Sequence, residues 1–316
     1  MRVWQGSIPS RQRVFRLEYP LTVGTTMKYI ASKLYKYHSN NLRFLNTALE
    51  KNAASARIAI ATEDQDSIKT FVRVHHFLLG AWTEVRLCKL LNEHQSFDSV
   101  EMEKIKKCQT QLEQWNKVVE LAFRRRYKVK KASLSDNSLD PTTYHRYQVI
   151  NGVINHELKD IIELRNRIAH GQWEFLLNSE ATNVERDKME KIQRENLQSL
   201  IFKQRMINYL ANLIHDLVVS PETFERDFDK HYRGVLTFQK HIEKKSYADY
   251  EKMLKTNYRI GKEKQREQLE TLRNEIRREL EAELKVKIRS DLEAELARRE
   301  KSNSFLSKIK SFVSSS

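Results

Sequence analysis

Glycine and proline are scarce along the whole chain. The sequence contains 7 glycines and 4 prolines among 316 residues, whereas average usage would supply roughly three times as many. Strand-rich folds need such turn-forming residues at short intervals, so their scarcity argues against a sheet. We therefore expect an all-α protein whose helices form an antiparallel up-and-down bundle.

The clearest helix of this bundle is expected to begin near residue 65. Residues 62–65 match a capping box, the pattern that satisfies free backbone N–H groups at a helix start. Gly80 lies inside the helix, where a glycine often marks the close approach of a second helix. Spacings of three and four alternate along an apolar seam, which predicts the central helix of the bundle. The seam residues are Phe71, Val74, Leu78, Ala81, Val85 and Cys88.

Three further start signals divide the rest of the bundle. Asp98–Glu101 is another capping box, and its helix is expected to end in the basic run at 124–131. Asp140-Pro141 opens a helix that Gly171 is suited to end. Residues 182–185 are expected to cap a last long helix that reaches about residue 219.

The composition shifts along the chain, and we expect four segments. Residues 1–22 alternate apolar and polar side chains as a short extended segment does. Residues 23–220 carry the bundle, and the aromatic-rich residues 221–250 are expected to form a helical connector docked on it. Residues 251–316 are expected to form a long charged helix with a short amphipathic tail, since 26 of the 50 residues from 251 to 300 are charged.

Leucine and isoleucine recur every four residues within the charged segment. A step of four advances about 40° around a helix of 3.6 residues per turn, so this stripe winds around the helix and forms no straight coiled-coil seam. We expect a largely solvated helix that can self-associate or bind a partner. The stripe positions are 272, 276, 280, 284, 288, 292 and 296.

The chain carries a formal net charge of +15. A balance this basic favours a polyanionic partner, either nucleic acid or an anionic membrane surface. Its densest basic run, "RRRYKVKK", is either a solvated helix end or an RNA backbone contact with Tyr127 available for stacking. The basic residues of this run are Arg124, Arg125, Arg126, Lys128, Lys130 and Lys131.

Several signals bear on compartment and cofactors. The sequence contains no run of 18 apolar residues, so we predict no membrane span. The N-terminus lacks an apolar leader, so we do not expect secretion. Cys88 and Cys108 are expected to be reduced thiols of a cytoplasmic protein, although the basic first 50 residues faintly resemble an organellar transit peptide. The sequence has no glycine-rich phosphate loop and no HExxH motif, and His75-His76 lacks a third ligand, so we expect no cofactor and no metal.

The stretch "IIELRNRIAHGQWEF", residues 161–175, combines a core helix with charged side chains. Arg165 falls on the apolar face, where a guanidinium is costly unless it meets an anion. Asn166 and His170 share a neighbouring face, whereas Arg165 and His170 point about 140° apart within one helix. A structural alternative is that the arginines pair with glutamates, with Glu84 a candidate partner for Arg165, while His170 complements the helix C-terminus.

The run "LRNRIAHG", which closes one helix of an expected all-α bundle, resembles the motif of the HEPN superfamily. That motif is an arginine, a polar residue, a few further residues and a histidine, and Arg165, Asn166 and His170 match it position by position. The resemblance covers about residues 60–220. Some family members have a tyrosine two positions after the histidine, where this chain has Gln172.

The resemblance implies a homodimer with a composite active site and metal-independent endoribonuclease activity of a toxin or anti-phage defence effector. Attack by the RNA 2′-hydroxyl would leave a 2′,3′-cyclic phosphate. Arg165, His170 and Asn166 would be catalytic, and Arg167 would be a second phosphate contact. The alternatives are a non-catalytic RNA-binding or regulatory HEPN module and a helical scaffold, with residues 251–316 available to an antitoxin or sensor partner.

Overall fold

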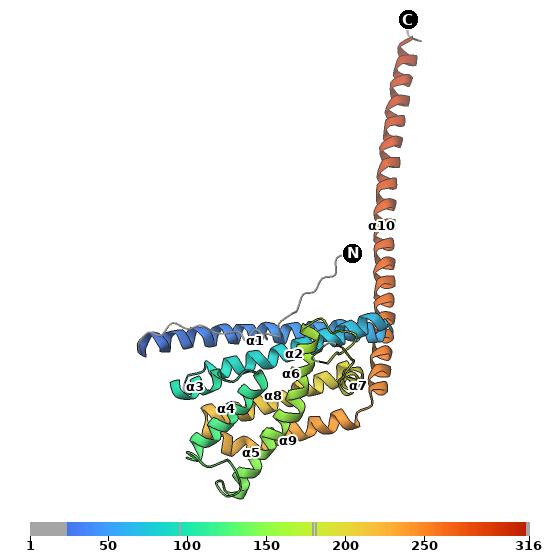
Figure 1. Ribbon diagram of the computed structural model, residues 1–316. Helices are drawn as coiled ribbons and strands as arrows, with labels where there is room; N and C mark the ends of the chain where they lie inside the picture. Colours follow the sequence, from blue (N-terminus) through green and yellow to red (C-terminus); the bar gives the residue numbers. More distant parts are fainter. Residues whose placement is uncertain (1–23, 95, 179, 181, 314–316) are drawn as a thin grey trace, which may run out of the picture. The chain divides into compact units, whose positions relative to one another are not determined.

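The computed structural model describes residues 24–94, 96–178, 180 and 182–313, with side chains described from residue 33 to residue 300 (Figure 1). The predicted extended segment, residues 1–22, and the side chains of the predicted amphipathic tail lie outside this description. The described part is helical apart from the connections between helices, and its isolated β-bridge, Leu177 to Val184, belongs to no strand. The all-α prediction is confirmed.

Most helices of the described residues follow one another with short links, and the two longest links are residues 127–140 and 170–185. The helices are α1 (Gly24–Ala61), α2 (Gln65–Leu91), α3 (Ser99–Lys106), α4 (Gln111–Arg126), α5 (Pro141–Val153), the π-helical turn η1 (Ile154–Leu158), α6 (Lys159–Ala169), α7 (Arg186–Arg194), α8 (Leu197–Val219), α9 (Pro221–Lys244) and α10 (Tyr247–Val313). None of these helices is apolar enough over a sufficient length to cross a bilayer.

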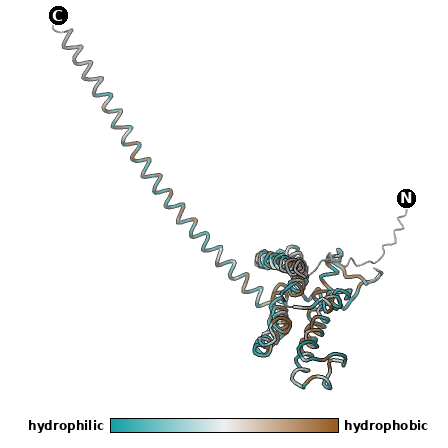
Figure 2. The backbone as a smooth tube through the Cα atoms, turned by 90° about the vertical axis from the view of Figure 1, so that its left-hand side faces the viewer, coloured by the Kyte–Doolittle hydropathy of each residue, from teal (hydrophilic) through white to brown (hydrophobic). Residues whose placement is uncertain are grey.

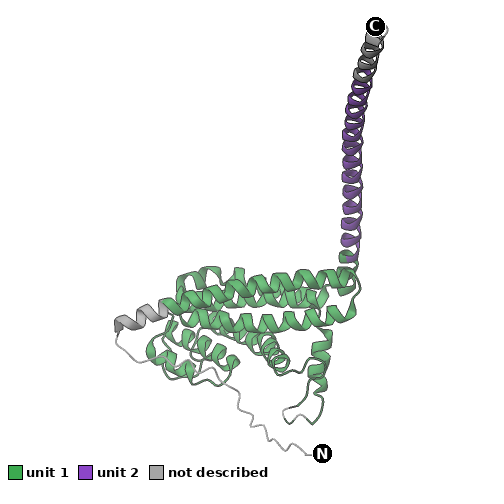
Figure 3. Cartoon of the chain, turned by 90° about the horizontal axis from the view of Figure 1, so that it is seen from above, with its two compact units in different colours: residues 1–254 green, residues 255–316 purple. Residues whose placement is uncertain are grey.

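The chain divides into two compact units, Met1–Leu254 and Lys255–Ser316 (Figure 3). In the first unit α1 and α2 form one hairpin, α8 and α9 form another, and α5, η1 and α6 make one continuous rod (Figure 1). Helix α2 packs against α1, α6 and α8, so it is the central helix that the sequence predicted. An up-and-down order for the whole bundle stays a prediction.

The apolar seam predicted for α2 is displaced from the face that is most buried. All six predicted residues are only half-buried, whereas Val72, Leu79 and Leu87 are at most 5 % exposed. Because three helices pack around α2, burial is not confined to one stripe. Polar side chains such as His75 and His76 are buried with it.

One predicted cap and two predicted helix spans were wrong. Helix α2 begins after Asp64, whose carboxylate accepts from Ser67 N, so residues 62–65 are not its capping box. The helix expected from Asp98 stops at Lys106, and α4 restarts at a second capping box, that of Thr110. The last predicted helix is likewise two helices, because a capping box at Asn196 starts α8.

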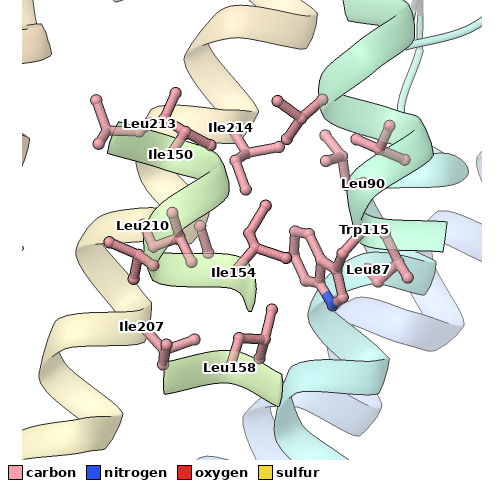
Figure 4. Close-up of a cluster of buried hydrophobic side chains, with 14 of the residues drawn as sticks. Leu87, Leu90, Trp115, Ile150, Ile154, Leu158, Ile207, Leu210, Leu213 and Ile214 are labelled. Atoms are coloured by element: carbon pink, nitrogen blue, oxygen red, sulfur yellow. The ribbon is translucent and has the colours of Figure 1, made fainter. Parts of the chain in front are cut away.

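The helix predicted from Pro141 to His170 contains the π-helical turn η1. In a regular α-helix each step of four over-rotates by about 40°, which would carry Ile150, Ile154 and Leu158 off one face. The wider hydrogen-bonded ring of a π turn accommodates one extra residue. The three side chains are consequently fully buried, and they face α8 on one side and α2 and α4 on the other (Figure 4).

The second unit is the C-terminal part of α10. Its apolar stripe is interspersed with charged residues, so hydrophilic and hydrophobic stretches alternate along the tube (Figure 2). Every residue from 259 to 300 is exposed. Local pairs such as Glu295 and Arg299, with Nη2 and Oε1 2.9 Å apart, support the helix from within.

Candidate active site at the end of helix α6

Gly80 of α2 makes room for Arg165 of α6. A Cβ at Gly80 would lie 2.5 Å from Arg165 Cγ, a distance that no real contact tolerates. Glycine therefore lets the stem of the arginine cross directly over the α2 backbone. The predicted close approach of two helices at Gly80 is confirmed.

The guanidinium of Arg165 is held by a small network on α2 and α4. Its Nη2 pairs with Glu84 Oε2 and donates to Gln111 Oε1 at 3.3 Å. Gln111 Nε2 donates to Thr83 Oγ1 at 2.9 Å, and that hydroxyl donates to Gly80 O at 2.7 Å. The suggested ion pair with Glu84 is present, so the structural alternative explains part of the charge on this helix.

The network leaves part of the Arg165 guanidinium unused. Its side chain is 19 % exposed, against 44 % for Glu84. Nε is buried without a hydrogen-bond partner, and Nη1 makes no hydrogen bond to the described residues. Since a guanidinium carries five N–H donors in a rigid fork, the N–H groups of Nη1 remain able to bind an anion.

His170 is the C-cap residue of α6. Its backbone N–H donates to Asn166 O and Arg167 O, both at 3.1 Å. Gly171 follows with φ +81° and ends the helix, as the sequence predicted. The His170 side chain is exposed and makes no hydrogen bond within the described residues, so its imidazole is open to solvent.

The three motif residues lie on one helix end but do not form a closed constellation in one chain. Within the described residues no hydrogen bond joins Arg165 to His170, and the half-buried Asn166 side chain bonds to neither. The described residues of one chain therefore hold no direct hydrogen-bonded contact among the three motif side chains.

Arg167, expected as a second phosphate contact, clasps the loop after α6. Its Nη1 donates to Leu177 O, and its Nη2 lies 2.8 Å from Glu185 Oε1. Leu176 in the same loop is fully buried. Both Nη groups of this guanidinium are bonded to the protein, so the side chain holds the loop in place.

The arginines of the basic run are likewise engaged with the protein. Arg124 Nε donates to Glu120 at 2.8 Å, and Arg125 Nη2 donates to Val218 O at 2.6 Å. Arg126 Nη2 lies 3.0 Å from Glu225 Oε1. The Arg124 contact lies within α4, whereas those of Arg125 and Arg126 fasten the end of α4 to α8 and α9.

The lysines of the basic run are different. Lys128, Lys130 and Lys131 are exposed, and their ammonium groups have no ion-pair partner among the described residues. The run therefore separates into structural arginines and free lysines, a division that charge counting could not reveal.

His75 and His76 are buried in α2. Burial, which disfavours the charged imidazole, lowers the pKa of each to about 4. The described residues contain no group of three or more His, Cys, Asp or Glu side chains arranged to hold a metal ion.

Sequence reasoning did not identify Gln111, because its contact with Arg165 depends on where α4 restarts after a break that the apolar pattern does not signal.

No family model, curated protein or solved structure matches this chain.

Proposed function

We propose that this chain is a metal-independent endoribonuclease of the HEPN type that acts as a homodimer. The observation that carries the proposal is that a fixed guanidinium and an exposed, unpartnered imidazole lie near the same helix end. Arg165 keeps unused Nη1 donors, and His170 is exposed without a partner.

The chemistry assigns each side chain one task. His170 removes the proton of the RNA 2′-hydroxyl, whose oxygen forms a bond to the adjacent phosphorus. The bond from phosphorus to O5′ breaks, and His170 of the second copy protonates the leaving oxygen. The products are a 2′,3′-cyclic phosphate and a 5′-hydroxyl, and Arg165 Nη1 stabilises the extra negative charge on the phosphoryl oxygens.

On one helix Arg165 and His170 are expected to point about 140° apart, and a second copy of the chain can bring the two kinds of side chain together. Two α6 ends related by two-fold symmetry bring a second Arg165 and a second His170 to one cleft, so each arginine works with the histidine of the other chain. Lys128, Lys130 and Lys131 offer free positive charge for the RNA backbone.

Cleavage of single-stranded RNA in EDTA tests the proposal. We expect wild-type protein to cut and His170→Ala and Arg165→Ala to lose roughly 10²–10⁴-fold in rate, the usual contribution of a general acid–base group or a charge-stabilising donor. His145→Ala, which removes an exposed histidine of α5, is the matched control and should cut normally. Absence of cleavage by wild type, or equal cleavage by all variants, would contradict the proposal.

The Glu84 pair favours a second candidate, a non-catalytic RNA-binding module. A carboxylate on Arg165 offsets the charge that would otherwise attract a phosphate. In that case RNA binding has a steep salt dependence, survives His170→Ala and yields no product. Product formation by wild type decides between the two candidates.

A further inference from the structure

A polar groove of about 740 Å³ lies open to solvent and is lined by residues of α3, α4, α5 and η1. It is separate from the Arg165 network. Gln111, which contacts Arg165, and Glu120, which lines the groove, are nine residues apart on α4. At about 100° per residue they lie on opposite faces of that helix.

The two carboxylates of the groove are already occupied. Glu113 Oε2 accepts from the backbone N–H groups of Gln109 at 2.7 Å and Thr110 at 3.3 Å, and the second of these bonds belongs to the α4 capping box. Glu120 accepts from Lys117 at 2.6 Å and from Arg124 at 2.8 Å. Burial raises the pKa of Glu120, but these hydrogen bonds outweigh it and hold the pKa below its usual value. Two cations therefore offset the charge of Glu120, whereas Glu113 keeps its negative charge at the groove.

Two lysines of the same groove have unused charge. Lys104 and Lys107, at the end of α3, are exposed, and their ammonium groups have no partner in the described part of the chain. Together they supply two positive charges at one edge of the groove. Spare ammonium groups at an open groove suit a phosphate-bearing chain.

The groove is also lined by amide side chains, one of which belongs to the π-helical turn. Asn116 and Asn155 exchange hydrogen bonds of 3.0 and 3.2 Å, and Asn155 Nδ2 also donates to Asn151 O at 2.9 Å. The side-chain amide of Asn151 makes no hydrogen bond to the described residues. It offers a donor and an acceptor side by side, as the edge of a nucleobase requires.

An aromatic ring completes the groove. Tyr147 packs at an angle of 69° against Phe123 with ring centroids 5.0 Å apart, so its orientation is fixed. Base–aromatic stacking is the usual sequence-tolerant contact of proteins with single-stranded nucleic acid.

We propose that this groove is a binding subsite for single-stranded RNA, distinct from the cleavage site. Lys104 and Lys107 bind backbone phosphates, Tyr147 stacks on a base and Asn151 hydrogen-bonds to its edge. RNA as the ligand rests on the proposed function. A strand that occupies both places has to cross α4, which is about 10–12 Å wide with its side chains, so a single nucleotide cannot reach both.

Cys108 provides a reporter inside the groove of the full-length protein. Its thiol is half-buried among the lining residues, and burial raises its pKa. Burial, with Glu84 adding to the effect, raises the pKa of Cys88 to about 11, so Cys108 is the more reactive of the two thiols. The experiment measures the rate at which iodoacetamide alkylates Cys108, read by peptide mass, with and without a single-stranded RNA of about ten nucleotides.

Bound RNA is expected to protect Cys108. At an RNA concentration about nine times the Kd, alkylation should slow about tenfold, because one site in ten is then free. Lys104→Gln combined with Lys107→Gln should weaken protection and reduce the slope of log affinity against log salt by about 1.4. Lys240→Gln combined with Lys244→Gln, an equal charge change at exposed positions of α9, is the matched control.

The outcomes separate this subsite from the nuclease. If RNA protects Cys108 but is not cleaved, the subsite is supported and the nuclease proposal is wrong. If RNA is cleaved but does not protect Cys108, the nuclease proposal is supported and the subsite is wrong. The subsite is also overturned if the double lysine variant is protected as well as wild type, or if polyglutamate protects as well as RNA, which would indicate an acidic protein partner.

Discussion

Two apolar stripes of this chain share a spacing of four residues and have opposite environments. Ile150, Ile154 and Leu158 are fully buried, whereas the stripe from 272 to 296 in α10 is about half exposed at each position. In the first, a π-helical turn accommodates one residue more than an α-helix would and keeps the side chains on one face, between α8 on one side and α2 and α4 on the other. In the second, the helix stays regular and the stripe winds around it. Spacing alone therefore does not decide burial; opposing helices do.

The largest expected effect comes from removing single residues. If η1 holds one extra residue, deleting Asn155 restores a regular α-helix with spacings of four and three and leaves Arg165 over Gly80. Deleting Phe77 of α2 instead rotates half of the central helix by about 100° and should prevent folding. Circular dichroism on heating compares the two. Equal loss of folding in both deletions would show that the π turn carries no spare residue.

Truncating one leucine in each stripe tests the contrast directly. Leu158→Ala should cost about 2–5 kcal/mol of unfolding free energy, because a fully buried side chain leaves a cavity. Leu284→Ala, at a position 58 % exposed, should change it by less than about 0.5 kcal/mol. Urea unfolding of the full chain measures both. A large loss in Leu284→Ala would mean that α10 is covered in solution.

Acidification should weaken the first unit alone. In the folded chain the pKa of His75 and of His76 is lowered from 6.5 to about 4. Each imidazole therefore binds a proton more readily in the unfolded chain. Stability is thus kept above pH 6.5 and falls from there towards pH 4, by up to about 1.4 kcal/mol per pH unit for each histidine. Urea titrations across this range measure the slope. The segment from 247 to 316 has no histidine, so a peptide of it should show no such change in helicity near pH 6.

The smallest expected difference in stability is between alanine substitutions at two glycines. Gly80→Ala forces a Cβ against Arg165 and should destabilise by about 1–3 kcal/mol while displacing the guanidinium. Gly152→Ala meets no atom within 4 Å and should be neutral or stabilise by up to about 1 kcal/mol. Thermal unfolding gives the sign of each change. If Gly80→Ala is neutral, α6 does not lie as close to α2 as the structure has it.

The features predicted correctly are those set by a few neighbouring residues. The capping box at Asp98, the Asp140-Pro141 start and the stop at Gly171 depend on local backbone hydrogen bonds and on one positive φ. The close approach at Gly80 followed from a glycine inside an apolar pattern. The break before α4 was missed although the capping box formed by Thr110 and Glu113 marks it locally. The phase of burial on α2 was missed because it depends on which helices pack alongside.

The candidate site also has features that the sequence predicted and features that only the structure showed. The type and spacing of Arg165 and His170 were evident from the sequence, as was Glu84 as a possible partner. That Gln111 joins the network, that Arg167 fastens a loop and that Arg124 to Arg126 bind the protein itself were not evident. An arginine has the same charge whether it faces a carboxylate, a backbone carbonyl or solvent, and only its neighbours distinguish these cases.

The sequence by itself determined that this chain is helical, where several helices start and stop, and that a guanidinium and an imidazole share one helix end. These depend on backbone propensity and spacing, which act within a few residues. The tertiary structure decided which apolar stripe is buried, which cations remain free and where a polar groove opens, because burial and charge pairing are set by residues far apart in the chain.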